Sequence, residues 1–181
     1  METELKDYEK WWTNNLGNKT YIHNGKEIKA PSTSTFEKWM GDSFSADRVC
    51  VRKEFGNFKT ILDTGCGACP EYNGIINMYK DVKYTGMDIT PKLVEYNISK
   101  NINCVHGSIN NIPFEDNSFD IVHSRHVVEH MSTIEKPLDE MIRVATQKVF
   151  NSFFIKPTNE SKHIISLDNK GTKGEVYHNK Y

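Results

Sequence analysis

The stretch KTILDTGCGACP, residues 59–70, decides the fold. It opens with a short apolar run and closes on a turn that contains Gly65 and Gly67. A continuous apolar run that ends in a glycine turn is typical of a buried strand in a parallel sheet. The residues after the turn, 70–80, have the pattern of a helix. The stretch therefore predicts a strand, a tight turn and a helix, in that order.

Downstream of this unit, strand patterns alternate with helical ones. Thr90 and Pro91 are residue types favoured at the N-cap and at the first position of a helix. We predict strands at 83–89, 102–106, 119–125 and 148–156, and helices starting at 91 and spanning 127–131 and 134–146. This alternation is typical of a parallel sheet with helices on both faces. The predicted fold class is therefore α/β, with a doubly wound, mostly parallel sheet.

The segments on either side of this core are less regular. Before Lys59 the sequence predicts a helical lead, with a helix at 4–16, a polar loop at 17–35 and a second helical stretch. After Pro157 it predicts one strand, at 163–167. Because neither an internal repeat nor a linker interrupts the chain, we expect a single domain over 1–181, divided into a lead or lid at 1–58, a ligand-binding core at 59–157 and a short C-terminal segment at 158–181.

Composition restricts the functional classes. Among 181 residues, 37% are hydrophobic, and 23 basic side chains against 24 acidic ones give a net charge of -1, which favours neither a nucleic-acid nor a membrane partner. No apolar run approaches the roughly 20 residues of a membrane span. The opening METELKDYEKWW carries acids and lacks an apolar region, so we expect no signal peptide and a cytoplasmic location. The four cysteines are too scattered for a disulfide scaffold and are expected to be reduced.

The glycine turn is the predicted ligand contact. In doubly wound sheets, ligands bind past the carboxyl ends of the strands, and the first strand-to-helix turn touches them. Gly65 and Gly67 allow the backbone to approach a ligand without an intervening Cβ. Asp88, at the end of the second strand, suits a ribose diol, because one carboxylate can accept both hydroxyl protons.

These residues resemble the class I S-adenosylmethionine-dependent methyltransferases, in particular the small-molecule type with an L-E-H-like motif after strand four. The family's acid-x-G-x-G-x-G motif is matched at Asp63, Gly65 and Gly67, with Cys69 in place of the third glycine. The nicotinamide fingerprint G-x-G-x-x-G would need glycine where Pro70 stands, so a dinucleotide is the weaker interpretation.

The resemblance also implies a set of cofactor contacts along residues 58–157. Asp88 corresponds to the ribose acid, Ile89 to an apolar contact on one face of the adenine, and Ser108 to the acceptor for the adenine amino group. HVVEHM, 126–131, matches the L-E-H region. The implied cofactor-binding residues are Asp63, Gly65, Cys66, Gly67, Asp88, Ile89, Ser108, Ile109 and Ser124.

The resemblance implies an enzyme that transfers a methyl group from S-adenosylmethionine to an unidentified small-molecule acceptor, with S-adenosylhomocysteine as the product. A non-catalytic protein that binds either adenosyl compound, as a sensor or as a subunit of a complex, is the alternative. His126 is the candidate catalytic base, because the unperturbed pKa of histidine suits proton transfer near neutral pH.

Two motifs have competing interpretations. HVVEH, 126–130, fits the H-x-x-E-H zinc pattern, but only a short helix precedes Ser132, and the methyltransferase order already accounts for it. Cys66 and Cys69 form a C-x-x-C pair, but Cys50 and Cys104 offer no second pair. We therefore expect no metal and no redox function.

The two ends of the chain leave alternatives open. The family sheet has seven strands, of which the last two form an antiparallel pair, so the C-terminal strands are expected to be incomplete. A longer native chain, a partner or second copy that covers the sheet edge, or a divergent relative would each account for this. The aromatic residues of the N-terminal lead are expected to form core or to cover the cofactor: Tyr8, Trp11, Trp12, Tyr21 and Trp39.

Overall fold

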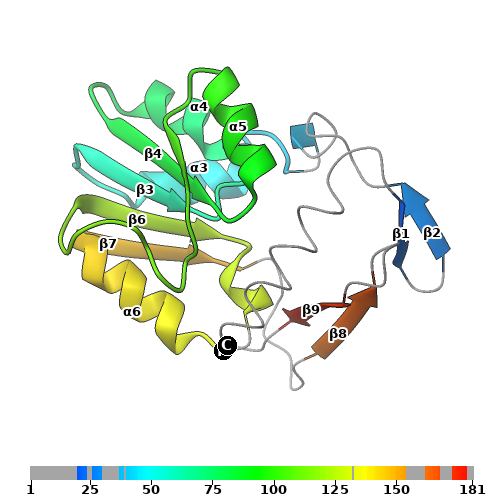
Figure 1. Ribbon diagram of the computed structural model, residues 1–181. Helices are drawn as coiled ribbons and strands as arrows, with labels where there is room; N and C mark the ends of the chain where they lie inside the picture. The colour runs from blue at the N-terminus through cyan, green and yellow to red at the C-terminus, as the bar shows by residue number, and fades with distance from the viewer. Residues whose placement is uncertain are drawn as a thin grey trace.

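The computed structural model has a five-stranded parallel sheet at its centre, with strand order β5-β4-β3-β6-β7 (Figure 1). It describes residues 37–38, 40–131 and 133–153, and the backbone of four further strand segments, 20–23, 26–29, 162–167 and 173–178. The strands of the central sheet are β3 (Thr60–Thr64), β4 (Lys83–Asp88), β5 (Cys104–His106), β6 (Phe119–Arg125) and β7 (Ala145–Ser152). The doubly wound α/β class is therefore confirmed.

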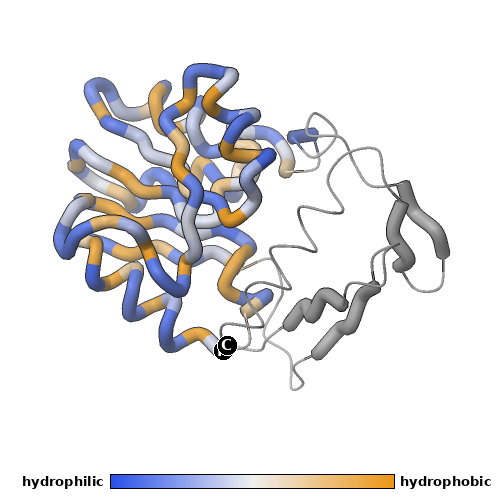
Figure 2. The backbone as a smooth tube through the Cα atoms, viewed as in Figure 1, coloured by the Kyte–Doolittle hydropathy of each residue, from blue (hydrophilic) through white to orange (hydrophobic). Residues whose placement is uncertain are grey.

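Helices cover both faces of this sheet. The first face carries α3 (Ala46–Lys53), α4 (Pro70–Met78) and α5 (Pro91–Ser99), and the second carries α6 (Glu135–Val144), which contacts β6 and β7. Successive strand residues point to opposite faces. Ile61 and Ile121 accordingly belong to the core under the first group of helices, and Leu62 and Val122 to the core under α6. Figure 2 shows these apolar stretches along the strands, with hydrophilic residues in the outer loops.

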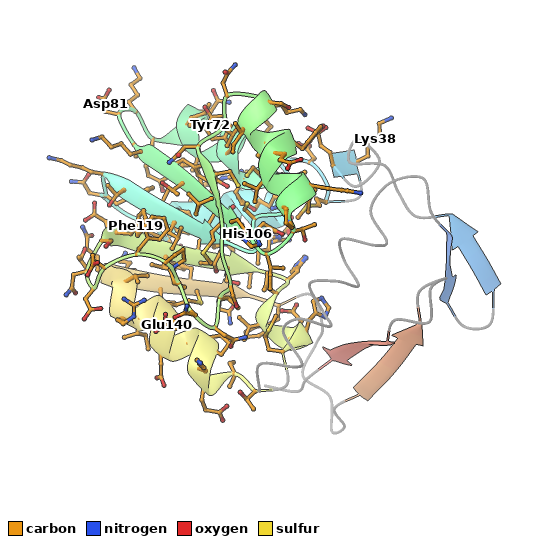
Figure 3. All side chains as sticks on the ribbon, viewed as in Figure 1. Lys38, Tyr72, Asp81, His106, Phe119 and Glu140 are labelled. Atoms are coloured by element: carbon orange, nitrogen blue, oxygen red, sulfur yellow. The ribbon has the colours of Figure 1, made fainter. Side chains whose placement is uncertain are left out.

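The strands share one direction, so the sheet has two chemically different ends. In Figure 3, Asp81, which precedes β4, and His106, the last residue of β5, lie at opposite ends. The chain reverses its winding direction between β3 and β6, which are neighbours in the sheet. A crevice is expected at the carboxyl ends of strands on either side of such a switch point. The fold thus places the glycine turn, which follows β3, at that crevice.

The structure differs from the prediction in the two segments that flank the central sheet, the first of which lies before β3. Within the predicted loop at 17–35, β1 (Thr20–His23) pairs antiparallel with β2 (Lys26–Lys29). The two residues between them in the sequence are Asn24-Gly25, the commonest hairpin signal, which the sequence reasoning overlooked. The predicted helix at 4–16 and the side chains of Tyr8, Trp11, Trp12, Tyr21 and Trp39 lie outside the described residues.

The C-terminal segment contains two strands, where the sequence analysis predicted one. β8 (Lys162–Leu167) and β9 (Lys173–His178) pair antiparallel in a sheet of their own. Among the described residues, β5 and β7 are the two edge strands of the five-stranded sheet, and the expected incompleteness of the C-terminal strands stays a prediction. Within the same residues, no helix combines the length and apolarity that a membrane crossing requires.

Candidate functional site

A cleft of about 490 Å³ lies at the carboxyl ends of β3, β4 and β6. Nearly all of the predicted site residues line it: Asp63, Gly65, Cys66, Gly67, Asp88, Ile89, Ser108, Ile109 and His126. Ser124 is the exception, because it is buried within β6 and is not part of the lining, whereas the next residue, Arg125, is. The family-implied role of Ser124, which concerned backbone atoms, stays a prediction.

The turn after β3 depends on left-handed backbone conformations. Gly65 and Gly67 have φ of 66° and 56°. A Cβ on Gly65 would lie 2.4 Å from Cγ2 of Val127, so this position has no room for a side chain. Val127 belongs to the HVVEHM segment that follows β6. The glycine turn and that segment are therefore packed directly against each other at one wall of the cleft.

Cys69 stands where the family motif usually has its third glycine, and its backbone explains that preference. Its φ of 51° is left-handed, and it is the N-cap residue of α4. An L-residue in this conformation costs about 1–2 kcal/mol relative to the right-handed region. In this chain the left-handed position is therefore occupied by a residue that has a side chain.

Asp88 fastens the glycine turn to the end of β4. Its Oδ2 accepts a 2.8 Å hydrogen bond from the backbone N–H of Gly67, and its Oδ1 accepts a 2.8 Å bond from the N–H of Thr90. Burial raises the pKa of this carboxyl, and the two backbone N–H groups oppose that rise. Because each carboxylate oxygen has two lone pairs, Asp88 retains acceptor capacity for a ligand hydroxyl in the cleft.

Asp63 also forms side-chain contacts with the neighbouring strands beneath the cleft. Its Oδ2 accepts a 2.7 Å bond from the hydroxyl of Tyr84, and its Oδ1 lies 3.1 Å from Nδ1 of His123. All three side chains are buried. Asp63 belongs to β3, Tyr84 to β4 and His123 to β6, and β3 lies between the other two strands. Asp63 therefore joins the three central strands, in addition to lining the cleft.

The predicted adenine side contains Ile89, Ser108 and Ile109. The hydroxyl oxygen of Ser108 accepts a 3.2 Å bond from the N–H of Asn110, so the loop after β5 partly occupies its acceptor capacity. Leu93 from α5 and Gly107 complete this part of the lining and were not predicted. Leu93 lies in the first turn of α5, and Gly107 follows β5, where its N–H donates a 3.0 Å hydrogen bond to the carbonyl of Asp88.

Another part of the cleft lining is charged. Arg125 forms an ion pair with Asp47, and Arg48 forms a buried one with Glu71; all four residues line the cleft. Arg52 of α3 lies behind them, 2.6 Å from the other oxygen of Glu71. Glu71 thus holds α3 and its two guanidinium groups against the start of α4.

His126 lies in this charged part of the cleft, and its surroundings make it a weaker base than an ordinary histidine. Burial, together with the nearby positive charges of Arg125 and Arg48, lowers its pKa from 6.5 to about 4. The sequence argument relied on an unperturbed pKa, and that premise is wrong. The ring is neutral at pH 7 and is a weak base, because its protonated form is disfavoured.

The HVVEH segment does not form the helix that a zinc motif needs. The helical part, η1, spans only Val128–His130, and His126 precedes it with φ of 58°. His126 and His130 therefore do not project from one continuous helix face. Among the described residues, the group of metal-binding side chains that does converge is a different one, formed by Cys66, Cys69 and Cys104. Sequence reasoning had set Cys104 apart from the C-x-x-C pair.

Residues before β3 complete the cleft. Met40, Gly41, Asp42 and Ser45 line it, and Sδ of Met40 lies 3.2 Å from the backbone N of Ala68. The sequence supported a lid from the lead in general terms but did not identify its residues. The sequence pattern of 36–55 predicts a helix through them, which is wrong for this part: 40–45 form turns, and α3 begins only at Ala46.

The comparisons with known proteins agree with this geometry. A family profile described as a methyltransferase domain matches residues 62–149. Ajmaline N-methyltransferase of Rauvolfia serpentina is 30% identical over 95 residues, 48% of this chain and 32% of that protein. Uncharacterized protein MJ0638 of Methanocaldococcus jannaschii is 32% identical over 141 residues, 68% of this chain and 58% of that protein. The chain thus spans only part of the length of these relatives.

Solved structures share the fold at lower sequence identity. A SAM-dependent methyltransferase from Aquifex aeolicus superposes with a TM-score of 0.57 at 20% identity, over 81% of this chain and 97% of that one. Phosphoethanolamine N-methyltransferase 2 of Haemonchus contortus, in complex with S-adenosyl-L-methionine, gives 0.55 at 18% identity, over 74% of this chain and 33% of that one. The motif order, the parallel sheet and the domain match agree: residues 62–149 match a methyltransferase domain, and the fold is the Rossmann-like fold of solved S-adenosylmethionine-dependent methyltransferases.

Proposed function

We propose that this chain transfers a methyl group from S-adenosylmethionine to a small-molecule acceptor and releases S-adenosylhomocysteine. The observation that carries the proposal is the pairing of the buried Asp88 carboxylate with the left-handed glycine turn, 2.8 Å apart at Gly67. This pairing supports a ribose on Asp88 and the rest of the adenosyl ligand along Gly65 to Gly67. The cleft volume of about 490 Å³ also suits a small ligand.

The fit to the cofactor is supported by what the turn leaves out. Both glycines line the cleft, and at Gly65 the space for a side chain is already taken by Val127. Ile89 and Leu93 supply apolar contacts, and Asp88 supplies a hydrogen-bond acceptor. We assign the ribose to Asp88, the adenine to Ile89, Ser108 and Ile109, and the methionine portion to the glycine turn near Cys66.

The chemistry assigned to the protein is positioning. When bound, the cofactor supplies a methyl group that the sulfonium charge already activates. The protein must hold the acceptor in line with the methyl carbon and exclude water, which is catalysis by orientation. His126 is assigned to the acceptor side of the cleft, as a neutral imidazole that orients the acceptor by hydrogen bonding. Its low pKa makes it a poor proton acceptor there.

The acceptor side of the cleft has both signs of charge. Its acids and bases, Asp47 with Arg125 and Glu71 with Arg48, are paired with one another. This supports a polar acceptor of modest net charge more than a polyanion. The name of one relative, ajmaline N-methyltransferase, adds support for an amine among the acceptors to test.

The test has two stages. Calorimetry with S-adenosylhomocysteine measures binding, and mass spectrometry then follows its formation from S-adenosylmethionine with a panel of small amines, alcohols and thiols. Binding with turnover of one panel member is the expected result. Binding without turnover of any acceptor would favour the non-catalytic alternative, and absence of binding would refute both.

A further inference from the structure

Three cysteine thiols meet in the interior beside the glycine turn. Cys66 and Cys69 come from the turn after β3, and Cys104 is the first residue of β5. All three are buried, with exposed fractions of 3%, 2% and 6%. Their sulfur atoms lie within 4.8 Å of one another, and Sγ of Cys66 is 3.7 Å from Sγ of Cys104. We call these three residues the thiol cluster.

The strand register explains why the thiol cluster forms. Cys104 pairs with Gly86 of β4, and β4 lies between β5 and β3. An ideal Cβ on Gly86 would lie 2.9 Å from the sulfurs of Cys66 and Cys69 and 3.3 Å from that of Cys104. The sulfurs therefore surround the space that the missing side chain of Gly86 leaves free.

The spacing of the sulfurs suits a metal ion. A Zn–S bond of about 2.3 Å in tetrahedral geometry separates two ligand sulfurs by about 3.8 Å. The 3.7 Å between Cys66 and Cys104 matches this value, and the upper limit of 4.8 Å for the cluster requires only a small contraction. A disulfide would instead require two sulfurs to approach to about 2.05 Å.

A polar neighbour supports negative charge on the sulfurs. Asn97 of α5 is fully buried, and its Nδ2 lies 3.6 Å from Sγ of Cys104 and 4.0 Å from Sγ of Cys66. The same nitrogen donates a 2.8 Å bond to the carbonyl of Gly67, which fixes the orientation of the amide. The donor side of Asn97 thus faces the thiol cluster, where an N–H group can stabilise negative charge on sulfur.

We propose that Cys66, Cys69 and Cys104 form a buried three-thiolate site for one soft metal ion of the Zn²⁺ or Cu⁺ class. Binding forms three metal–sulfur bonds and releases to solvent the protons that the thiols carried, with no change of oxidation state. With Zn²⁺ the site keeps a charge of −1, and with Cu⁺ a charge of −2. Zn²⁺ is the preferred occupant, because burial disfavours residual charge. The ion would tie the glycine turn to β5.

This site shares Cys66 with the proposed cofactor contacts, but its test does not depend on methyl transfer, because the test measures metal content. The full-length chain is purified under reducing, anaerobic conditions, incubated with Zn²⁺ alone and dialysed, and its metal content is measured by elemental analysis. In parallel, Co²⁺ replaces Zn²⁺, so that the charge-transfer absorption of thiolate-bound Co²⁺ reports the ligands. A separate anaerobic titration with Cu⁺ against a chromogenic chelator covers the other ion.

Cys69→Gly is the decisive variant. It restores glycine at a left-handed position, so the backbone strain there falls and the fold is expected to persist. It also removes one ligand. Cys104→Ser is the second variant, and Cys50→Ser is the matched control, because Cys50 is exposed and outside the cluster.

We expect one equivalent of Zn²⁺ in the wild type and in Cys50→Ser, and loss of that equivalent in Cys69→Gly. One equivalent of Cu⁺ in place of Zn²⁺, with the same dependence on Cys69, would support the site with the other ion. Retention of metal in Cys69→Gly and Cys104→Ser would overturn the proposal. So would a wild-type protein that binds neither ion, or one that forms a Cys66–Cys104 disulfide in preference to binding metal.

Discussion

The backbone N–H of Gly67 donates a 2.8 Å hydrogen bond to Oδ2 of Asp88, so the glycine turn and the end of β4 form one unit. The same carboxylate holds the N–H of Thr90 at the start of α5. One side chain therefore sets the position of the turn, of a helix and of the proposed ribose contact. Changes at Asp88 should affect the ligand more than the fold, because the strand itself keeps its ladder bonds.

Asp88→Ala is expected to weaken S-adenosylhomocysteine binding by about 2–3 kcal/mol, since hydrogen bonds to a charged group are worth roughly 1.5–3 kcal/mol. Asp88→Asn should lose less, because one acceptor oxygen remains. Calorimetry measures both. Asp116→Asn, in an exposed ion pair outside the cleft, is the control. Equal affinity of the wild type and Asp88→Ala would remove Asp88 from the ribose contact.

Gly65→Ala should destabilise the fold through two separable effects. The φ of 66° costs an L-residue about 1–2 kcal/mol. The new Cβ would also clash with Val127 and add about 1–3 kcal/mol of overpacking. Gly41→Ala is the matched control, because Gly41 has φ of 86° but nothing within 4 Å of the added Cβ. Urea unfolding should rank Gly65→Ala below Gly41→Ala, and an equal loss would contradict the packing argument.

Glu71→Ala should cost about 3–5 kcal/mol of folding free energy, because it leaves the buried Arg48 and Arg52 guanidinium groups without their carboxylate. Glu37 offers a contrasting pair with Lys100, 2.6 Å apart but with both side chains about 40% exposed (39% for Lys100 and 41% for Glu37). Glu37→Ala should cost less than about 1 kcal/mol. Thermal unfolding of the two variants compares them, and similar losses would argue against a buried role for Glu71.

The lowered pKa of His126 should make the stability of the fold depend on pH. Its pKa is about 4 in the folded chain and has an ordinary value of 6.5, so between these values the unfolded chain binds more protons. With respect to this group the fold is therefore most stable above pH 6.5, and its free energy of unfolding decreases as the pH falls from 6.5 toward 4. Because the ring is only half-buried, we expect about 1 kcal/mol after screening by solvent.

Urea midpoints at pH 7 and pH 5 provide the measurement for His126. The drop in stability should be smaller for His126→Asn than for the wild type, because asparagine does not titrate. If the variant loses as much stability as the wild type over this range, the titrating group is a different one. The same variant, assayed for methyl transfer, should show a changed affinity for the acceptor more than a changed pH profile.

Much of the core was predictable because its signals are local. β6 follows the predicted range 119–125 residue for residue, since an apolar run with clear ends leaves little freedom. The sequence does not predict β9, because 173–178 has few apolar residues. It does not predict the hairpin at 20–29 either, because the Asn24-Gly25 signal lies within a polar stretch that favours a loop.

The site was predictable where one motif sets the geometry and not where distant segments meet. Asp63 and Asp88 lie at the carboxyl ends of β3 and β4, and Gly65 and Gly67 follow β3, at strand ends that the sequence locates. The approach of Cys104 to the glycine turn depends on the Gly86–Cys104 register, which no spacing along the chain reveals. The low pKa of His126 likewise requires Arg48 and Arg125 to be brought together by folding.

The contacts of Asp63 with Tyr84 and His123 bear on how a ligand enters and leaves. They join β3, β4 and β6 by side chains directly under the cleft, in addition to the ladder bonds. Spreading these strands would expose three buried polar groups, so the floor is a poor route of access. The rates of ligand exchange should therefore be governed by the segment before α3 that carries Met40 and Asp42, which also lines the cleft.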